Sequence, residues 1–243
     1  MPDYIWALVL IGAIGLPTTT SALLYRRAPK VALAAGALLL AWLVGSALLA
    51  AAGFYRQDPT VVTPWIGVTV VVVLAALLAA TRIPAVRQAL AGPDIPARLA
   101  AVQTVRLVGV MFLLAMVLGR LPAVFALPAA FGDMAIGAAA PFIARRLRNG
   151  SDRGAVWFNV LGIVDHVVAI VIGFLAAVGP TQLLFVTPST GEIGLLPLVL
   201  IPTVAVPLAM TLHVISLARL RGTRGTHVAQ GRQTGPQADP VAR

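Results

Sequence analysis

The sequence predicts an all-α membrane protein, a bundle of seven transmembrane helices with the amino terminus outside and the carboxyl terminus inside. Three observations predict it: an apolar composition, seven separate runs of about 20 apolar residues, and basic residues concentrated in alternate loops. Of the 243 residues, 59% are hydrophobic and only 11% are charged. Soluble domains are near half apolar and a quarter charged, so lipid is the expected solvent for most of this chain.

Each apolar run is long enough to cross the hydrocarbon core as a helix. A segment surrounded by lipid must satisfy its own backbone hydrogen bonds, and these runs are continuous rather than alternating as in a β-barrel. Seven spans are compatible with a repeat of three helices, one linking helix and three further helices. The predicted spans are residues 4–24, 31–53, 61–81, 99–119, 121–144, 155–178 and 194–218.

Basic residues in the loops set the predicted orientation. The first span has no basic residue before it, which favours an uncleaved first helix that starts outside. Fifteen lysines and arginines fall in the loops after spans 1, 3 and 5 and in the tail, whereas only Arg56 and Arg120 lie in the other loops. This positive-inside pattern places the carboxyl terminus in the cytoplasm. Residues 219–243, rich in Gly, Arg, Gln and Thr, are predicted to form a disordered basic cytoplasmic tail.

Five ionisable residues fall inside the predicted spans, where each is costly unless it faces the bundle interior and finds a partner. They are Arg106, Asp133, Asp165, His166 and His213. Counted at 1.5 Å per residue from flanking arginines, both aspartates lie about 18 Å deep, near the midplane. The long Arg106 side chain is predicted to reach one of them. The same counting separates His166 and His213 by about 10 Å in depth.

Small residues share the helix faces of these polar groups, which predicts that those faces pack against other helices. The Asp133 side of its span carries Pro122, Ala126, Ala129, Ala130, Gly137, Ala140 and Ala144, opposite Val124, Leu127, Phe131 and Phe142. In the next span, Ala155, Asn159, Gly162, His166, Ala169, Gly173 and Ala177 form one stripe with Asp165 at its edge.

Two interpretations of the polar residues remain open at this point. In one, Arg106 and an aspartate form a buried pair that only fixes helix register. In the other, Arg106, Asp133, Asp165, His166, Asn159 and His213 form a substrate site or proton relay, because one arginine cannot neutralise two carboxylates. The three prolines of the last span, Pro197, Pro202 and Pro207, favour a bent helix beside a cavity.

Several chemistries are disfavoured by what the sequence lacks. There is no cysteine, and no H-E-x-x-H, G-x-S-x-G or Walker motif, so we predict no metal site and no cofactor. The depth difference between the histidines disfavours a shared haem. The last span has no lysine, which excludes a retinal Schiff base. An enzyme using Asp165 and His166 as an acid–base pair is the least favoured hypothesis.

Three stretches carry a resemblance. They are Arg106-Leu-Val-Gly109 through Gly119-Arg-Leu-Pro122, Phe125-Ala-Leu-Pro128 and Gly132-Asp133; Trp157-Phe-Asn159 with Asp165; and Pro197-Leu-Val-Leu-Ile-Pro202 through Val206-Pro-Leu208 and His213. They resemble a group of uncharacterised bacterial multi-pass membrane proteins, mainly over the second half of the chain. The resemblance implies a helical membrane protein and no particular chemistry.

Taken together, the sequence predicts a multi-pass protein of the bacterial cytoplasmic membrane. The favoured function is a small-solute transporter or channel-like protein, proton-coupled, with a small molecule or ion as substrate. The alternative is a non-catalytic scaffold or accessory subunit. Expected partners are the lipid bilayer and anionic headgroups at the cytoplasmic arginines; the scattered charge gives no basic domain for nucleic acid.

Overall fold

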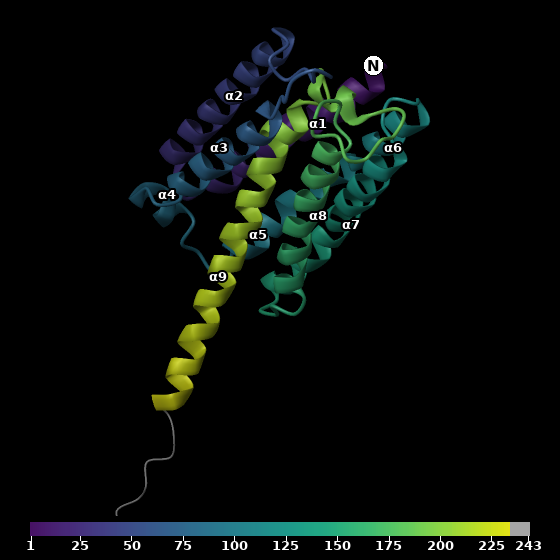
Figure 1. Ribbon diagram of the computed structural model, residues 1–243. Coiled ribbons are helices and arrows are strands. Elements are labelled where there is room, and N and C mark those ends of the chain that lie inside the picture. Colours follow the sequence, from purple (N-terminus) through teal and green to yellow (C-terminus); the bar gives the residue numbers. More distant parts are fainter. Residues whose placement is uncertain (234–243) are drawn as a thin grey trace, which may run out of the picture.

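A computed structural model describes residues 1–233, with side chains described to residue 221. Within these residues the chain forms helices and no strand. Figure 1 shows the helices as one bundle, from which α9 projects at one end. The elements are α1 (Asp3–Tyr25), α2 (Pro29–Ala51), α3 (Trp65–Ala80), α4 (Pro84–Ala89), α5 (Ile95–Val102), η1 (Gln103–Gly109), α6 (Val110–Val117), α7 (Ala123–Arg148), α8 (Ala155–Leu175), η2 (Thr190–Gly194), η3 (Ile201–Ala205) and α9 (Val206–Gln233).

Six helical segments in the described part of the chain are long and apolar enough to cross a membrane. They are α1, α2, the continuous run Ile95–Val117, α7, α8 and Ile201–Arg221. The third predicted span, residues 61–81, corresponds to α3, which has only 16 residues. At 1.5 Å per residue it rises about 24 Å, less than the roughly 30 Å hydrocarbon core. The chain is therefore all-helical, with six candidate spans and a shorter apolar helix.

The last predicted span differs from the structure at both of its ends. The long helix does not begin at residue 194, because residues 195–199 form a bend and turns and regular α-helix starts only at Val206, after the π-helical turn η3. Pro197 and Pro202 have no amide hydrogen to continue a helix there. At the other end α9 continues to Gln233, so residues 219–233 extend the helix rather than begin the predicted disordered tail; residues 234–243 lie outside the described residues.

The predicted packing faces are confirmed for α7. All seven residues of the small-residue stripe are buried, whereas Val124, Leu127, Phe131 and Phe142 are exposed. In α8 the first four residues of the stripe, from Ala155 to His166, are buried, and the remainder are half-buried. Small side chains let α7 approach both the Ile95–Val117 run and α8 closely.

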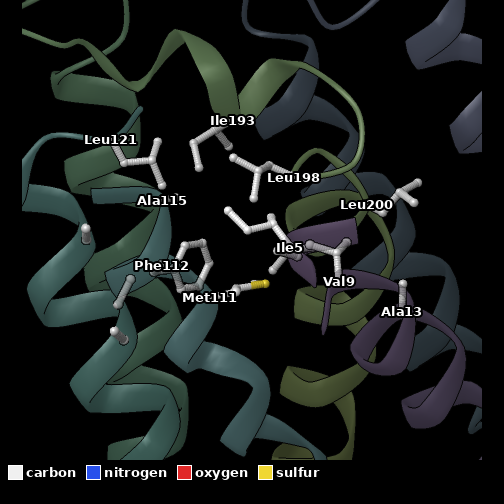
Figure 2. Close-up of a cluster of buried hydrophobic side chains, with 14 of the residues drawn as sticks. Ile5, Val9, Ala13, Met111, Phe112, Ala115, Leu121, Ile193, Leu198 and Leu200 are labelled. Carbon is white, nitrogen blue, oxygen red and sulfur yellow. The ribbon is translucent and has the colours of Figure 1, made fainter. Parts of the chain in front are cut away.

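Of the four clusters of buried apolar side chains among the described residues, two lie on either side of the polar residues along α7. Figure 2 shows the larger core, where α1 and α6 meet the segment between η2 and η3 around Ile5, Met111, Phe112 and Leu198. Its last fully buried residue on α7 is Ala130. The second core joins α7 from Ile136 onward to α8 and α9, through residues such as Phe158 and Leu220. The polar residues predicted from the sequence fall between these two cores.

Candidate functional site

Arg106 lies at the centre of the polar residues and contacts three other helices. Its Nε donates to Asp133 Oδ1 of α7 at 2.7 Å, and its Nη2 is ion-paired with Asp165 Oδ2 of α8. Its Nη1 lies 3.2 Å from His213 Nε2 of α9. Only 5% of the Arg106 side chain is exposed. The prediction that Arg106 pairs with Asp133 or Asp165 is confirmed, and the structure shows that it pairs with both.

His213 continues the hydrogen-bond network from Arg106 to Asn159. A guanidinium can only donate, so His213 Nε2 must accept and the ring proton must sit on Nδ1. His213 Nδ1 lies 2.9 Å from Asn159 Oδ1, which is an acceptor and therefore matches. Asn159 Nδ2 in turn donates to the Ala155 carbonyl at 2.7 Å and to Ser216 Oγ at 3.0 Å. The contacts thus require His213 to be the neutral Nδ1–H tautomer.

His166 occupies a different part of the site. Its Nδ1 donates to the carbonyl of Gly162, one turn earlier in α8, at 2.6 Å. The ring also borders a cavity of about 40 Å³ that Arg106 and Asp133 help to line. Such a volume holds a water molecule or two. Asp133 and Asp165 keep 18% and 15% of their side chains exposed, so the carboxylates are not completely sealed.

The two histidine rings are closer together than the sequence predicted. Their centroids lie 6.5 Å apart, against the predicted depth difference of about 10 Å. The counting assumed that Arg219 marks the membrane surface at the end of a straight helix. Counting along the backbone also leaves out how far the two side chains reach along their helices, so it overstated the separation of the rings. His213 still does not suit haem, because Arg106 and Asn159 occupy both of its ring nitrogens.

The backbone around Arg106 is a 3₁₀ helix, η1, which interrupts the helical run Ile95–Val117. Three residues per turn place Gln103 and Arg106 on one side, and both are buried. Gln103 Nε2 donates to the Ala209 carbonyl of α9 at 3.2 Å. The same turn therefore directs Arg106 to α7 and α8 while Gln103 ties it to α9.

Glycines make room for each polar group of the site. A methyl group at Gly109 would overlap Asp133, one at Gly132 would overlap the Asp165 carboxylate, and one at Gly162 would overlap the His213 ring. Each of these glycines lies on the helix opposite the residue that it accommodates. The polar side chains are thus packed against neighbouring backbones, which fixes the separations of η1, α7, α8 and α9.

Two groups of polar contacts were missed by the sequence reasoning. One is Ser216, whose position three residues after His213 on a helix could have signalled a shared face. The other joins α2 to η3: Trp42 Nε1 donates to the Thr203 carbonyl at 2.9 Å, and Ser46 Oγ lies 2.7 Å from Thr203 Oγ1. Nothing in the sequence linked these residues, which lie more than 150 positions apart.

The site contains two carboxylates and a single arginine. Arginine stays protonated in proteins, so Arg106 supplies one positive charge to two carboxylates. His213 is neutral by its hydrogen bonds and adds no charge. Among residues with described side chains, no group of three or more His, Asp or Glu side chains could hold a metal ion.

Comparison with known proteins gives a family and no activity. No curated protein and no solved structure matches the chain. Residues 63–221 match the model of a domain of unknown function, DUF8737. The match runs from the start of α3 to α9 and includes the Arg106 site, which consists of Arg106, Asp133, Asp165, His166, Asn159 and His213. It agrees with the resemblance to an uncharacterised family. Because it covers about two thirds of the chain, this protein belongs to the DUF8737 family.

Proposed function

We propose that this chain is a seven-span protein of the bacterial cytoplasmic membrane that transports a small solute in exchange or symport with protons. The observation that carries the proposal is the sharing of Arg106 by Asp133 and Asp165 in the middle of the bundle. With both carboxylates ionised, the site carries one negative charge in excess. Binding one proton neutralises it, and a buried group that alternates between these states is what a proton relay needs.

The surroundings of the site support a transporter over an open channel. Apolar cores lie on both sides of the charged residues, and Figure 2 shows side chains of the larger one pointing toward one another. Ions would need a continuous polar path, whereas a transporter needs a midplane site that is reached from one side at a time. The 3₁₀ turn η1 and the π-helical turn η3 are the kind of helix interruptions found beside such sites.

Proton flux in liposomes tests this function. Purified protein is reconstituted with a pH-sensitive dye inside, and a potassium gradient with valinomycin drives proton entry. The expected result is a flux that Asp133→Asn and Asp165→Asn each abolish, while Asp3→Asn, an exposed aspartate at the start of α1, leaves it unchanged. If the wild-type protein carries no flux with any of a panel of candidate solutes, the transport proposal is wrong.

A structural scaffold is the second candidate, and the glycine contacts favour it. Gly109, Gly132 and Gly162 lock the polar residues against backbones, as an interaction that only sets helix register would require. The two candidates differ in one measurable respect. If the chain is a scaffold, the aspartate variants should lose thermal stability and the wild-type protein should carry no proton flux. If it is a transporter, the aspartate variants should lose flux while they remain folded.

A further inference from the structure

A second and much larger cavity lies beside the Arg106 site. Its volume is about 520 Å³, within the usual range for small-molecule sites, and its surface is almost wholly apolar. It lies between α3 and α8, each of which packs against α9, as Figure 1 also shows. The cavity is deeper than a surface groove, because the buried side chains of Val70, Phe112, Phe125 and Met210 line it.

The cavity opens to the outer surface of the bundle. Val71 of α3 and Val171 and Phe174 of α8 line it, and 65%, 48% and 44% of these residues are exposed. Its polar lining residues are confined to the loop end, where Gln57 and Thr63 lie. Gln57 accepts a hydrogen bond from the Val178 amide at 2.8 Å, which fixes that end of the cavity. No charged side chain lines the cavity in the part of the chain that the structure describes.

The apolar lining, with no charged side chain among its described residues, limits what this cavity can bind. Water finds too few polar partners in an apolar cavity, and an empty cavity is unfavourable in proportion to its volume. A charged solute would have no counter-ion. A hydrocarbon chain would make apolar contacts with the lining side chains, and one small uncharged polar group fits the end that carries Thr63 and Gln57.

The cavity is also adjacent to the charged site. Ile201 and Val206 line both this cavity and the 40 Å³ cavity at Arg106, so the π-helical turn η3 is the wall between them. Ala169, another lining residue, lies one turn after Asp165 on α8. An occupant therefore lies across Ile201 and Val206 from the small cavity that Asp133 lines.

We propose that the 520 Å³ cavity is the substrate site and that the substrate is an uncharged long-chain amphiphile that enters from the lipid between α3 and α8. The proposal rests on the transport function given above and names its substrate class. In the predicted orientation the loop end of the cavity faces the outer leaflet. Substrate binding in this cavity is coupled to protonation of the aspartates on the far side of η3.

Photocrosslinking tests the site directly. Wild-type protein in phosphatidylcholine liposomes is exposed to a trace of hexadecanol carrying a diazirine, irradiated, digested and mapped by mass spectrometry. Adducts are expected on residues 62–81 and 169–177, and excess plain hexadecanol should abolish them. Adducts on Val117 and Phe142, which are 79% and 70% exposed, report ordinary lipid contact and should not be competed. Phosphatidylcholine is present in large excess throughout. Loss of the adduct on adding plain hexadecanol therefore shows that the cavity prefers the alcohol over phospholipid chains.

Two glycines provide matched variants. Gly67 lines the cavity on α3, and a Cβ there meets no atom within 4 Å; the same is true of Gly45 on α2, which does not line the cavity. Gly67→Leu fills the cavity and should lose the competed adduct, Gly67→Ala should keep part of it, and Gly45→Leu should keep all of it. An unchanged adduct in Gly67→Leu, or adducts that plain hexadecanol does not compete, would overturn the proposal.

The outcomes also separate this inference from the transport function. A competed adduct together with unchanged proton flux in the aspartate variants keeps the binding site and rejects coupling. Flux that depends on Asp133 and Asp165, with no competed adduct, keeps the transporter and rejects the substrate class. A stable dimer whose copies cover α3 and α8, measured by native mass spectrometry, would also reject it.

Discussion

At the scale of single residues, Arg106 organises the site because its guanidinium has donors enough for three helices. The sequence predicted the residues involved and their pairing, since a charged group inside a membrane must find a partner. It did not predict that both carboxylates share the arginine, because that depends on the rotation of α7 and α8 about their axes. The 3₁₀ geometry of η1, which aims Arg106, also leaves no clear pattern in the sequence.

Removing the arginine should therefore destabilise the bundle. In Arg106→Gln, two carboxylates lose their buried counter-ion, and loss of one partner of a buried ion pair costs about 3–5 kcal/mol. Thermal unfolding in detergent should show a large fall in melting temperature. Arg120→Gln is the control, because Arg120 is half exposed and contacts Glu192 at 3.4 Å. Equal effects of the two variants would contradict a central role for Arg106.

Glycine positions give a second prediction at this scale. Gly132→Ala and Gly162→Ala should lower the melting temperature, because the new methyl groups overlap the Asp165 carboxylate and the His213 ring. Gly45→Ala adds a methyl group to open space, where alanine is the better helix former by roughly 1 kcal/mol. It should leave the melting temperature unchanged or raise it. The contrast fails if all three variants behave alike.

At the scale of elements, the irregular start of α9 follows from its prolines. In a regular helix the Thr203 carbonyl would accept from residue 207, but Pro207 has no amide hydrogen. Trp42 of α2 supplies the missing donor at 2.9 Å. The three prolines predicted a bend in this span, and the structure shows a π-helical turn at that place. The sequence could not indicate the partner, because any donor on a neighbouring helix would serve.

This explanation predicts a rescue. Trp42→Phe keeps the ring but leaves the Thr203 carbonyl without its side-chain donor, which costs about 1–3 kcal/mol. Adding Pro207→Ala restores an amide that can donate to the same carbonyl, so the double variant should recover part of the lost melting temperature. Trp157→Phe, at a residue that is 67% exposed, should have little effect. Additive losses in the double variant would exclude this role for Trp42.

At the scale of the whole molecule, contacts between loops group them at two ends of the bundle. Arg27, after α1, is ion-paired with Asp94, before α5, and Arg219 donates to the Arg87 carbonyl at 3.3 Å. At the other end Gln57 contacts Val178, and Arg120 contacts Glu192. The alternation of basic loops predicted the same grouping. It arises because α3, despite its 16 residues, carries the chain from one end of the bundle to the other.

Reporter fusions test the sidedness and the role of α3 together. A reporter after Arg243 and one in residues 82–94 should be cytoplasmic, and reporters in residues 52–64 and 179–193 should be external. The reason is the excess of basic residues at one end of the bundle. An external reporter in residues 82–94 would show that α3 does not cross the membrane and that the span count is six.

The shared arginine also has a consequence during biosynthesis. Asp133 and Asp165 lie 27 and 59 residues after Arg106, so neither counter-ion has left the ribosome when the arginine does. At about 5–20 residues per second, the second aspartate follows roughly 3–12 s later. Until then the bare guanidinium opposes release of the nascent segment 95–117 into hydrocarbon. The chain should therefore hold that segment at the insertion machinery and deliver it to the bilayer together with α7 and α8.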